Sequence, residues 1–172
     1  MNSQRILVIG GMLLFLLSAA YGLFYDGFLH QEQNQVLMYN LDMALNMAAK
    51  GDLTTASAFA QEFGIESQTR DVQAHIPWHL AVAGATAIAP VWLAPKLDIS
   101  ERMKRLLALL ILSGGVVLAG GDFIKAMGHL KTGYYMTLTG YAWMALGLLG
   151  YFLYALLYIW LNQEDRERTK RG

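Results

Sequence analysis

Six residues of this sequence have the side-chain types of a metal-binding or acid–base site. They form three pairs: Asp26 with His30, His75 with His79, and Asp122 with His129. Residues four or seven positions apart lie on nearly the same face of an α-helix, which turns about 100° per residue. Each pair is therefore expected to present two side chains of metal-ligand type from one end of a helix.

The chemistry of these side chains favours copper or non-haem iron. Imidazole and carboxylate groups bind both metals, and the chain has no cysteine to supply thiolate ligands. His75 and His79 have the spacing of helical metal sites, but Ile76 stands where a metalloprotease has its glutamate, which excludes that assignment. We predict a metal centre with ligands or orienting groups drawn from all three pairs: His30, His75, His79, His129, Asp26 and Asp122. A b-type haem with His79 and His129 as axial ligands is the alternative.

Asp122 carries the most information among the six, because it ends a long uncharged run. A carboxylate at membrane depth is costly, faces the interior of a helix bundle and marks a functional site by default. Lys125, three residues later, offers a simpler explanation as the partner of an ion pair on the same helix. A second simple explanation is that the histidines are hydrogen-bonded residues at a membrane interface.

One short motif resembles a known family. Asp26-x3-His30, at the end of an apolar run, is similar to the Asp-x3-His part of a copper site in the membrane monooxygenases for methane and ammonia. The resemblance covers five residues and implies copper ligation by Asp26 and His30. The next histidine does not follow at the spacing of that family, so the chain is not assigned to it.

Apolar runs must position these side chains. The 172 residues are 55% hydrophobic, and a membrane-spanning helix takes about 20 predominantly apolar residues. We predict one integral membrane domain over residues 1–172, an all-α bundle of four transmembrane helices at 6–25, 72–94, 104–127 and 134–161. The first run also has the basic start and apolar core of a signal peptide, and we expect it to be retained as a helix.

A two-helix cap outside the membrane is predicted between the first two spans, over residues 31–66. Leu37, Leu41 and Leu45 repeat at helical spacing. Gly51 is expected to end the first cap helix and Asp52 to cap the start of the second. That second helix is expected to stop at Gly64.

Glycines recur every seven residues in the last two spans. They are Gly114, Gly121 and Gly128 in one, and Gly133, Gly140 and Gly147 in the other. Small residues let membrane helices approach closely. The two stripes are therefore expected to face each other across a tight antiparallel contact.

The charges predict the orientation. Lys and Arg concentrate in short cytoplasmic loops, which places the N-terminus, the 95–105 loop and the tail 162–172 inside the cell. Residues 26–71, with seven acidic and two basic side chains, then face outward from a cell inner membrane. All four histidines lie on that outer side.

Several functions remain open at this stage. The leading prediction is a membrane metal-binding protein for redox chemistry or metal handling, with an outer electron donor or quinone as a partner besides lipid. The alternatives are a haem electron-transfer protein and a non-catalytic subunit bound to partner membrane subunits. A proton-coupled transporter is less favoured, because the first and last spans lack ionisable residues at mid-membrane. Nucleic acid is not an expected partner, because the net charge is zero and no basic stripe with interleaved aromatic residues occurs.

Overall fold

The computed structural model describes the backbone of residues 2–171 and the side chains of residues 2–160. Within that range the chain is helical and has no strand. The five α-helices are α1 (Ser3–Phe24), α2 (His30–Ala49), α3 (Leu53–Ile88), α4 (Glu101–Ala126) and α5 (Leu130–Arg171). A π-helical turn, Tyr25–Leu29, joins α1 to α2, and two short 3₁₀ segments, Ala89–Trp92 and Ala94–Lys96, follow α3.

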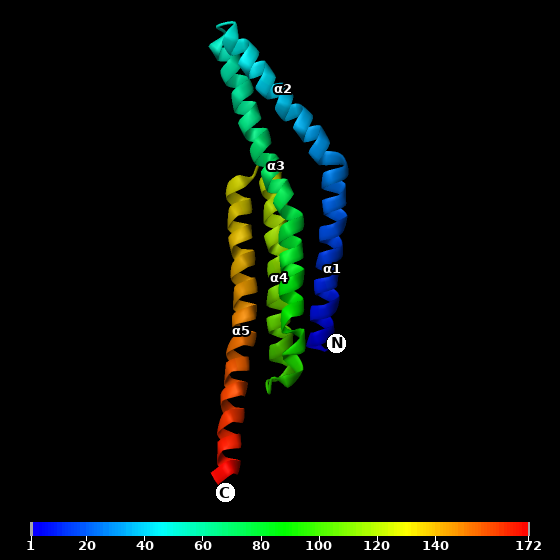
Figure 1. Ribbon diagram of the computed structural model, residues 1–172, viewed down its shortest axis with the longest axis vertical. Coiled ribbons are helices and arrows are strands. Elements are labelled where there is room, and N and C mark those ends of the chain that lie inside the picture. Colours follow the sequence, from blue (N-terminus) through cyan, green and yellow to red (C-terminus); the bar gives the residue numbers. More distant parts are fainter. Residues whose placement is uncertain (1, 172) are drawn as a thin grey trace.

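Four helical stretches are long and apolar enough to cross a membrane, namely Ser3–Ala49, Leu53–Lys96, Glu101–Ala126 and Leu130–Trp160. The parts of α1, α3, α4 and α5 beside one another form an elongated bundle (Figure 1). In it α3 packs between α1 and α4, whereas α5 packs almost entirely on α4. The predicted all-helical class is therefore confirmed.

The glycine contact between α4 and α5 is confirmed in detail. A methyl group added at Gly140 would lie 2.5 Å from the backbone nitrogen of Leu118, and one at Gly114 would lie 2.8 Å from the carbonyl oxygen of Gly140. Gly121 and Gly133 stand in the same relation, each close to the other's carbonyl oxygen. Gly128 lies instead in the α4–α5 turn, where its φ of +87° is a conformation that glycine adopts without strain.

Two helices are present between the first two apolar runs, but the structure does not support a cap over the bundle. α2 follows α1 through the π turn but leans away from its direction toward α3, and it pairs with the first half of α3 in a hairpin that projects beyond the bundle (Figure 1). The turn at Gly51 is as predicted, with φ +83°, and the Asp52 carboxylate accepts the Thr55 N–H at 3.1 Å. Gly64 does not end a helix, because its cost in a helix interior is only about 1 kcal/mol and packing against α2 outweighs it.

The buried face of α2 also differs from the predicted stripe. α2 buries Gln33, Leu37 and Asn40, whereas Leu45 is 63% exposed. The face that packs on α3 is thus partly polar, and the Gln33 amide donates to Gln73 Oε1 at 2.6 Å. An apolar stripe read along α2 by itself cannot show where α3 lies.

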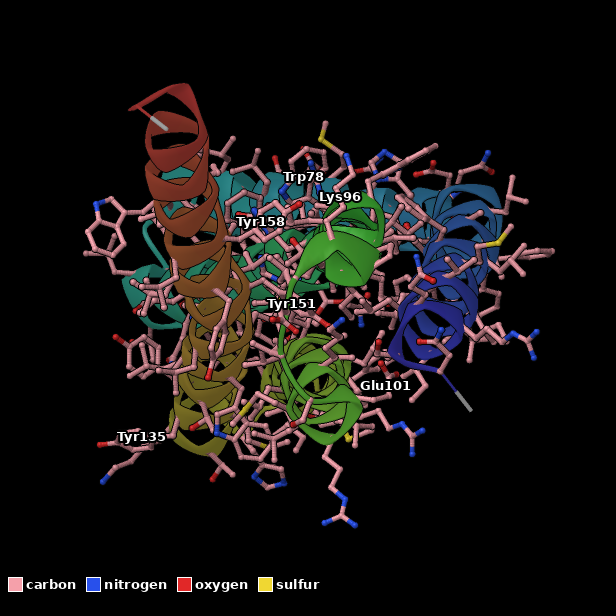
Figure 2. The ribbon with its side chains drawn as sticks, turned by 90° about the horizontal axis from the view of Figure 1, so that it is seen from below. Trp78, Lys96, Glu101, Tyr135, Tyr151 and Tyr158 are labelled. Carbon is pink, nitrogen blue, oxygen red and sulfur yellow. The ribbon has the colours of Figure 1, made fainter. Side chains whose placement is uncertain are left out.

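Inside the bundle, small and aliphatic side chains are buried, including Leu7, Ala83, Ala108, Ile111 and Leu118, each at 0% exposure. Large apolar side chains cover the exposed surface of the bundle, as at Leu16 (67% exposed) and Leu23 (77% exposed). Figure 2 shows Tyr151 pointing into the interior beside α4 and Tyr135 pointing away from α5. The Tyr151 hydroxyl donates to the Lys104 carbonyl at 2.9 Å, which ties α5 to the start of α4.

The predicted basic tail, residues 162–172, lies outside the residues whose side chains the structure describes. Its backbone belongs to α5 as far as Arg171.

Candidate functional site

His79 joins three helices through its two ring nitrogens. From α3 its Nδ1 contacts Asp122 Oδ2 on α4, and its Nε2 lies 2.9 Å from the Tyr141 hydroxyl on α5. An ionised carboxylate only accepts hydrogen bonds, so Nδ1 carries the hydrogen that it shares with Asp122. Nε2 then accepts from Tyr141 when the ring is neutral and donates to it when the ring is protonated.

Asp122 is the most enclosed member of this group, with 3% of its side chain exposed, compared with 14% for His79. Its second oxygen, Oδ1, accepts from Lys125 Nζ at 2.8 Å. Thr137 Oγ1 lies 3.4 Å from the same oxygen but 2.9 Å from the Gly133 carbonyl oxygen. Because a hydroxyl has one hydrogen, the shorter bond to Gly133 is the better one, and Lys125 is the stronger partner of Oδ1.

The packing of the helices explains why these groups meet. The glycine contact brings α5 close enough to α4 for Thr137 and Tyr141 to reach Asp122 and His79. On α3, Ile76 and Leu80 are buried on either side of His79, so the imidazole is held toward α4. The cluster lies near the α4–α5 turn, because Asp122 is close to the end of α4 at Ala126.

Charge determines what the cluster can do. Lys125 and Asp122 together are neutral, and His79 adds either no charge or one positive charge. A buried charge is tolerated only where hydrogen bonds and an opposite charge stabilise it, and Asp122 supplies both for an imidazolium. Tyr141, 45% exposed, lies between His79 Nε2 and the surface of the bundle. The cluster can therefore hold His79 either as a neutral imidazole or as an imidazolium.

The other predicted site residues lie elsewhere. His75 is exposed, and its Nδ1 lies 2.6 Å from the Asp71 carbonyl oxygen, although its ring centroid is 6.0 Å from that of His79. His129 is exposed just after the α4–α5 turn. Asp26 is exposed in the π turn.

His30 belongs to a separate polar chain at the base of the hairpin. Its Nε2 lies 3.0 Å from the Asn34 side-chain nitrogen, and Asn34 Oδ1 accepts from Arg70 at 2.9 Å. The Arg70 carbonyl accepts in turn from the Tyr25 hydroxyl at 3.2 Å. These bonds tie the start of α2 to α3.

The structure does not bring all six predicted residues together at a single centre. Among the described residues, no group of three or more His, Cys, Asp or Glu side chains is placed to hold one metal ion. Of the axial pair predicted for haem, His79 contacts Asp122 and Tyr141, whereas His129 is exposed. His129 lies beyond the end of α4, which stops at Ala126.

Thr137 and Tyr141 are the members of the cluster that sequence reasoning missed. They are four residues apart; Thr137 lies one turn from Gly133 on the face of α5 that carries the glycine stripe, and Tyr141 lies beside that face. A polar pair on and beside that face was the available signal that α5 contributes to the site.

Comparison with known proteins gives no further guide to function. No protein family model matches the chain, and no curated protein or solved structure matches it.

Proposed function

We propose that this is an integral membrane protein that takes up and releases a proton at His79, on the outer side of a cell inner membrane. Support for the membrane comes from the four long apolar helices and from the large apolar side chains on the surface of the bundle. Soluble proteins rarely expose continuous apolar surface on this scale. The N- and C-termini are assigned to the cytoplasm by the basic residues near them.

The observation that carries the proton site is the pair of bonds made by His79. Asp122 fixes the tautomer and orientation of the ring, and Tyr141 contacts the nitrogen that is left to exchange a proton. Histidine is the side chain suited to this role, because its ordinary charge change occurs between pH 5 and 8. Toward the inner end the bundle is filled by apolar residues such as Leu7, Leu107 and Ile111. Exchange is therefore proposed with the outer side only, as an acid–base centre and not as a channel.

The experiment is a ¹⁵N-histidine NMR titration of the protein in vesicles, with the external pH varied and the internal pH buffered. Histidine ring nitrogens report both tautomer and protonation, and His79→Gln assigns the signal. We expect the His79 signal to carry hydrogen on Nδ1 when neutral and to follow the external pH. His129→Gln, which changes an exposed histidine, is the matched control and should leave the His79 signal unchanged.

Two results would contradict the proposal. One is a His79 signal that does not change between pH 5 and 8, which would make the residue a purely structural link between helices. The other is a signal that follows the internal pH.

A metal centre is the second candidate, and one observation favours it. In many metal sites, a histidine ligand binds the metal with one ring nitrogen and donates a hydrogen bond to a carboxylate with the other. His79 Nδ1 and Asp122 have this arrangement. His79 Nε2 and the nearby ring of His75 would then be the ligands for copper or iron. Stoichiometric metal that is lost in both His79→Gln and His75→Gln would establish this candidate. Failure of both candidates would leave a non-catalytic subunit of a larger membrane complex.

A further inference from the structure

A cavity of about 420 Å³ lies between α1 and α4, on a different side of the bundle from the His79 cluster. Leu80 of α3 contributes to its lining. Cavities of this size hold small molecules, and this one lies within the apolar length of both helices.

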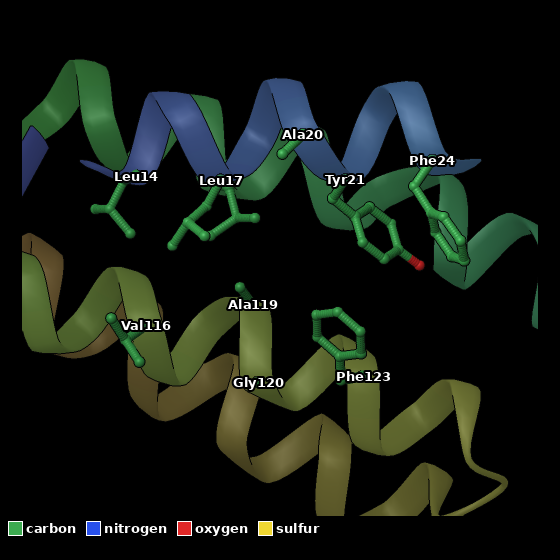
Figure 3. Close-up of a pocket in the computed structure, with 10 residues that line it drawn as sticks. Leu14, Leu17, Ala20, Tyr21, Phe24, Val116, Ala119, Gly120 and Phe123 are labelled. Atoms are coloured by element: carbon green, nitrogen blue, oxygen red, sulfur yellow. The ribbon is translucent and has the colours of Figure 1, made fainter. Parts of the chain in front are cut away.

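The lining changes in character from one end to the other. Both α1 and α4 run from the inner end of the bundle to the outer end, so residue order follows depth. Aliphatic side chains line the inner part and aromatic rings the outer part (Figure 3). The aliphatic residues are Leu14, Leu17 and Val116, and the aromatic residues are Tyr21, Phe24 and Phe123.

Small residues keep the middle of the cavity open. Ala20 on α1 faces Ala119 and Gly120 on α4. The nearest atom to a methyl group added at Gly120 would be Met136 Cε, at 3.7 Å. Among the described side chains, no other atom lies within 4 Å of that methyl group.

The chemistry of the lining limits what can bind. The ten lining residues include no charged side chain, and the Tyr21 hydroxyl is their one polar side-chain group. A phospholipid head group would find no cation here. A flat ring with a carbonyl group would find aromatic contacts and one hydrogen-bond donor, and its apolar tail would extend along the aliphatic part.

We propose that this cavity binds an isoprenoid quinone, with the ring near Tyr21 and Phe123 and the tail toward Leu14 and Val116. The ring end then lies at the depth of the proton site, because Leu80 follows His79 and Phe123 follows Asp122. The proposal concerns binding and does not depend on proton exchange at His79. The variants that test it are also separate from those that test the proton site.

The experiment measures binding of decylubiquinone to the full-length protein in detergent by native mass spectrometry. Ala20→Leu and Ala19→Leu are matched variants, because the same change at adjacent exposed positions fills the cavity only at Ala20. We expect a one-to-one complex that Ala20→Leu weakens at least tenfold and Ala19→Leu leaves within twofold. Tyr21→Phe should weaken it about fivefold, the effect of one hydrogen bond. Circular dichroism melting confirms that each variant is folded.

The proposal fails if no one-to-one quinone complex forms, or if Ala20→Leu and Ala19→Leu bind the quinone equally. It also fails if dioleoylphosphatidylglycerol displaces the quinone at equal concentration and loses binding in Ala20→Leu in the same way. That last result would identify the cavity as a site for ordinary lipid chains.

Discussion

At the scale of residues, the molecule places one carboxylate between an imidazole and an ammonium group. Asp122 uses one oxygen for His79 and the other for Lys125, so the two contacts do not compete for the same atom. Removing one partner from a buried ion pair leaves an uncompensated charge and typically costs about 3 to 5 kcal/mol. The contribution of each contact therefore depends on whether the other is present.

This dependence can be measured with Asp122→Asn, Lys125→Met and the double variant. We expect each single variant to lower the free energy of unfolding by about 3 kcal/mol. The double variant should lose less than the sum of the two, with a coupling of about 1 kcal/mol or more. Reversible unfolding in mixed micelles, followed by circular dichroism, measures these values. Lys131→Met, at an exposed lysine of α5, is the control and should change little, whereas strictly additive losses would contradict the pairing.

At the scale of elements, the α4–α5 contact positions the site. Its glycines allow backbone-to-backbone approach over several turns, and van der Waals packing of this kind drives helix association where lipid surrounds both helices. Thr137 and Tyr141 owe their positions to it. A shift of α5 away from α4 would separate Tyr141 from His79.

Gly140→Ala tests this contact against Gly64→Ala. The new methyl group at Gly140 would lie 2.5 Å from a backbone nitrogen and 2.7 Å from a carbonyl oxygen, so α5 must move, at a cost of about 1 to 3 kcal/mol. The new methyl group at Gly64 meets no atom within 4 Å and should stabilise the helix by up to about 1 kcal/mol. Thermal unfolding should therefore shift in opposite directions for the two variants. Equal shifts would show that the close approach of α4 and α5 is not needed.

At the scale of the whole molecule, the two ends of the bundle differ. The end near the hairpin carries the His79 cluster, the polar chain from Tyr25 to Arg70 and the hairpin itself. The opposite end is closed by apolar packing and by the bond from Tyr151 to the start of α4. The orientation predicted from the charges assigns the hairpin end to the outer side of the membrane.

Cysteine labelling tests that orientation directly, because the chain has no native cysteine. Thr54→Cys lies at the tip of the hairpin, and Lys96→Cys lies in the segment between α3 and α4; both positions are exposed. In right-side-out vesicles, a membrane-impermeant maleimide should label Thr54→Cys at once and Lys96→Cys only after permeabilisation. The reverse pattern would overturn the assignment of sides and, with it, the outer location of the proton site.

The sequence by itself determined the properties that depend on local pattern. Apolar run length predicted four long helices, and the period of the glycines predicted the α4–α5 contact. The isolation of Asp122 in an apolar run predicted that it would have a partner, and Lys125 was correctly considered as one. The turn at Gly51 with its Asp52 cap follows from residue types within four positions of one another.

Only the tertiary structure decided which residues share a site. Spacing along one helix shows which side chains share a face, but it does not show which neighbouring helix that face meets. Asp122 and Tyr141 follow His79 by 43 and 62 residues in the sequence. The three side chains meet only because of the way α3, α4 and α5 pack. The same reason explains why a hairpin stands where a cap was predicted. α3 continues through Gly64 because of its contact with α2, which the glycine alone does not reveal.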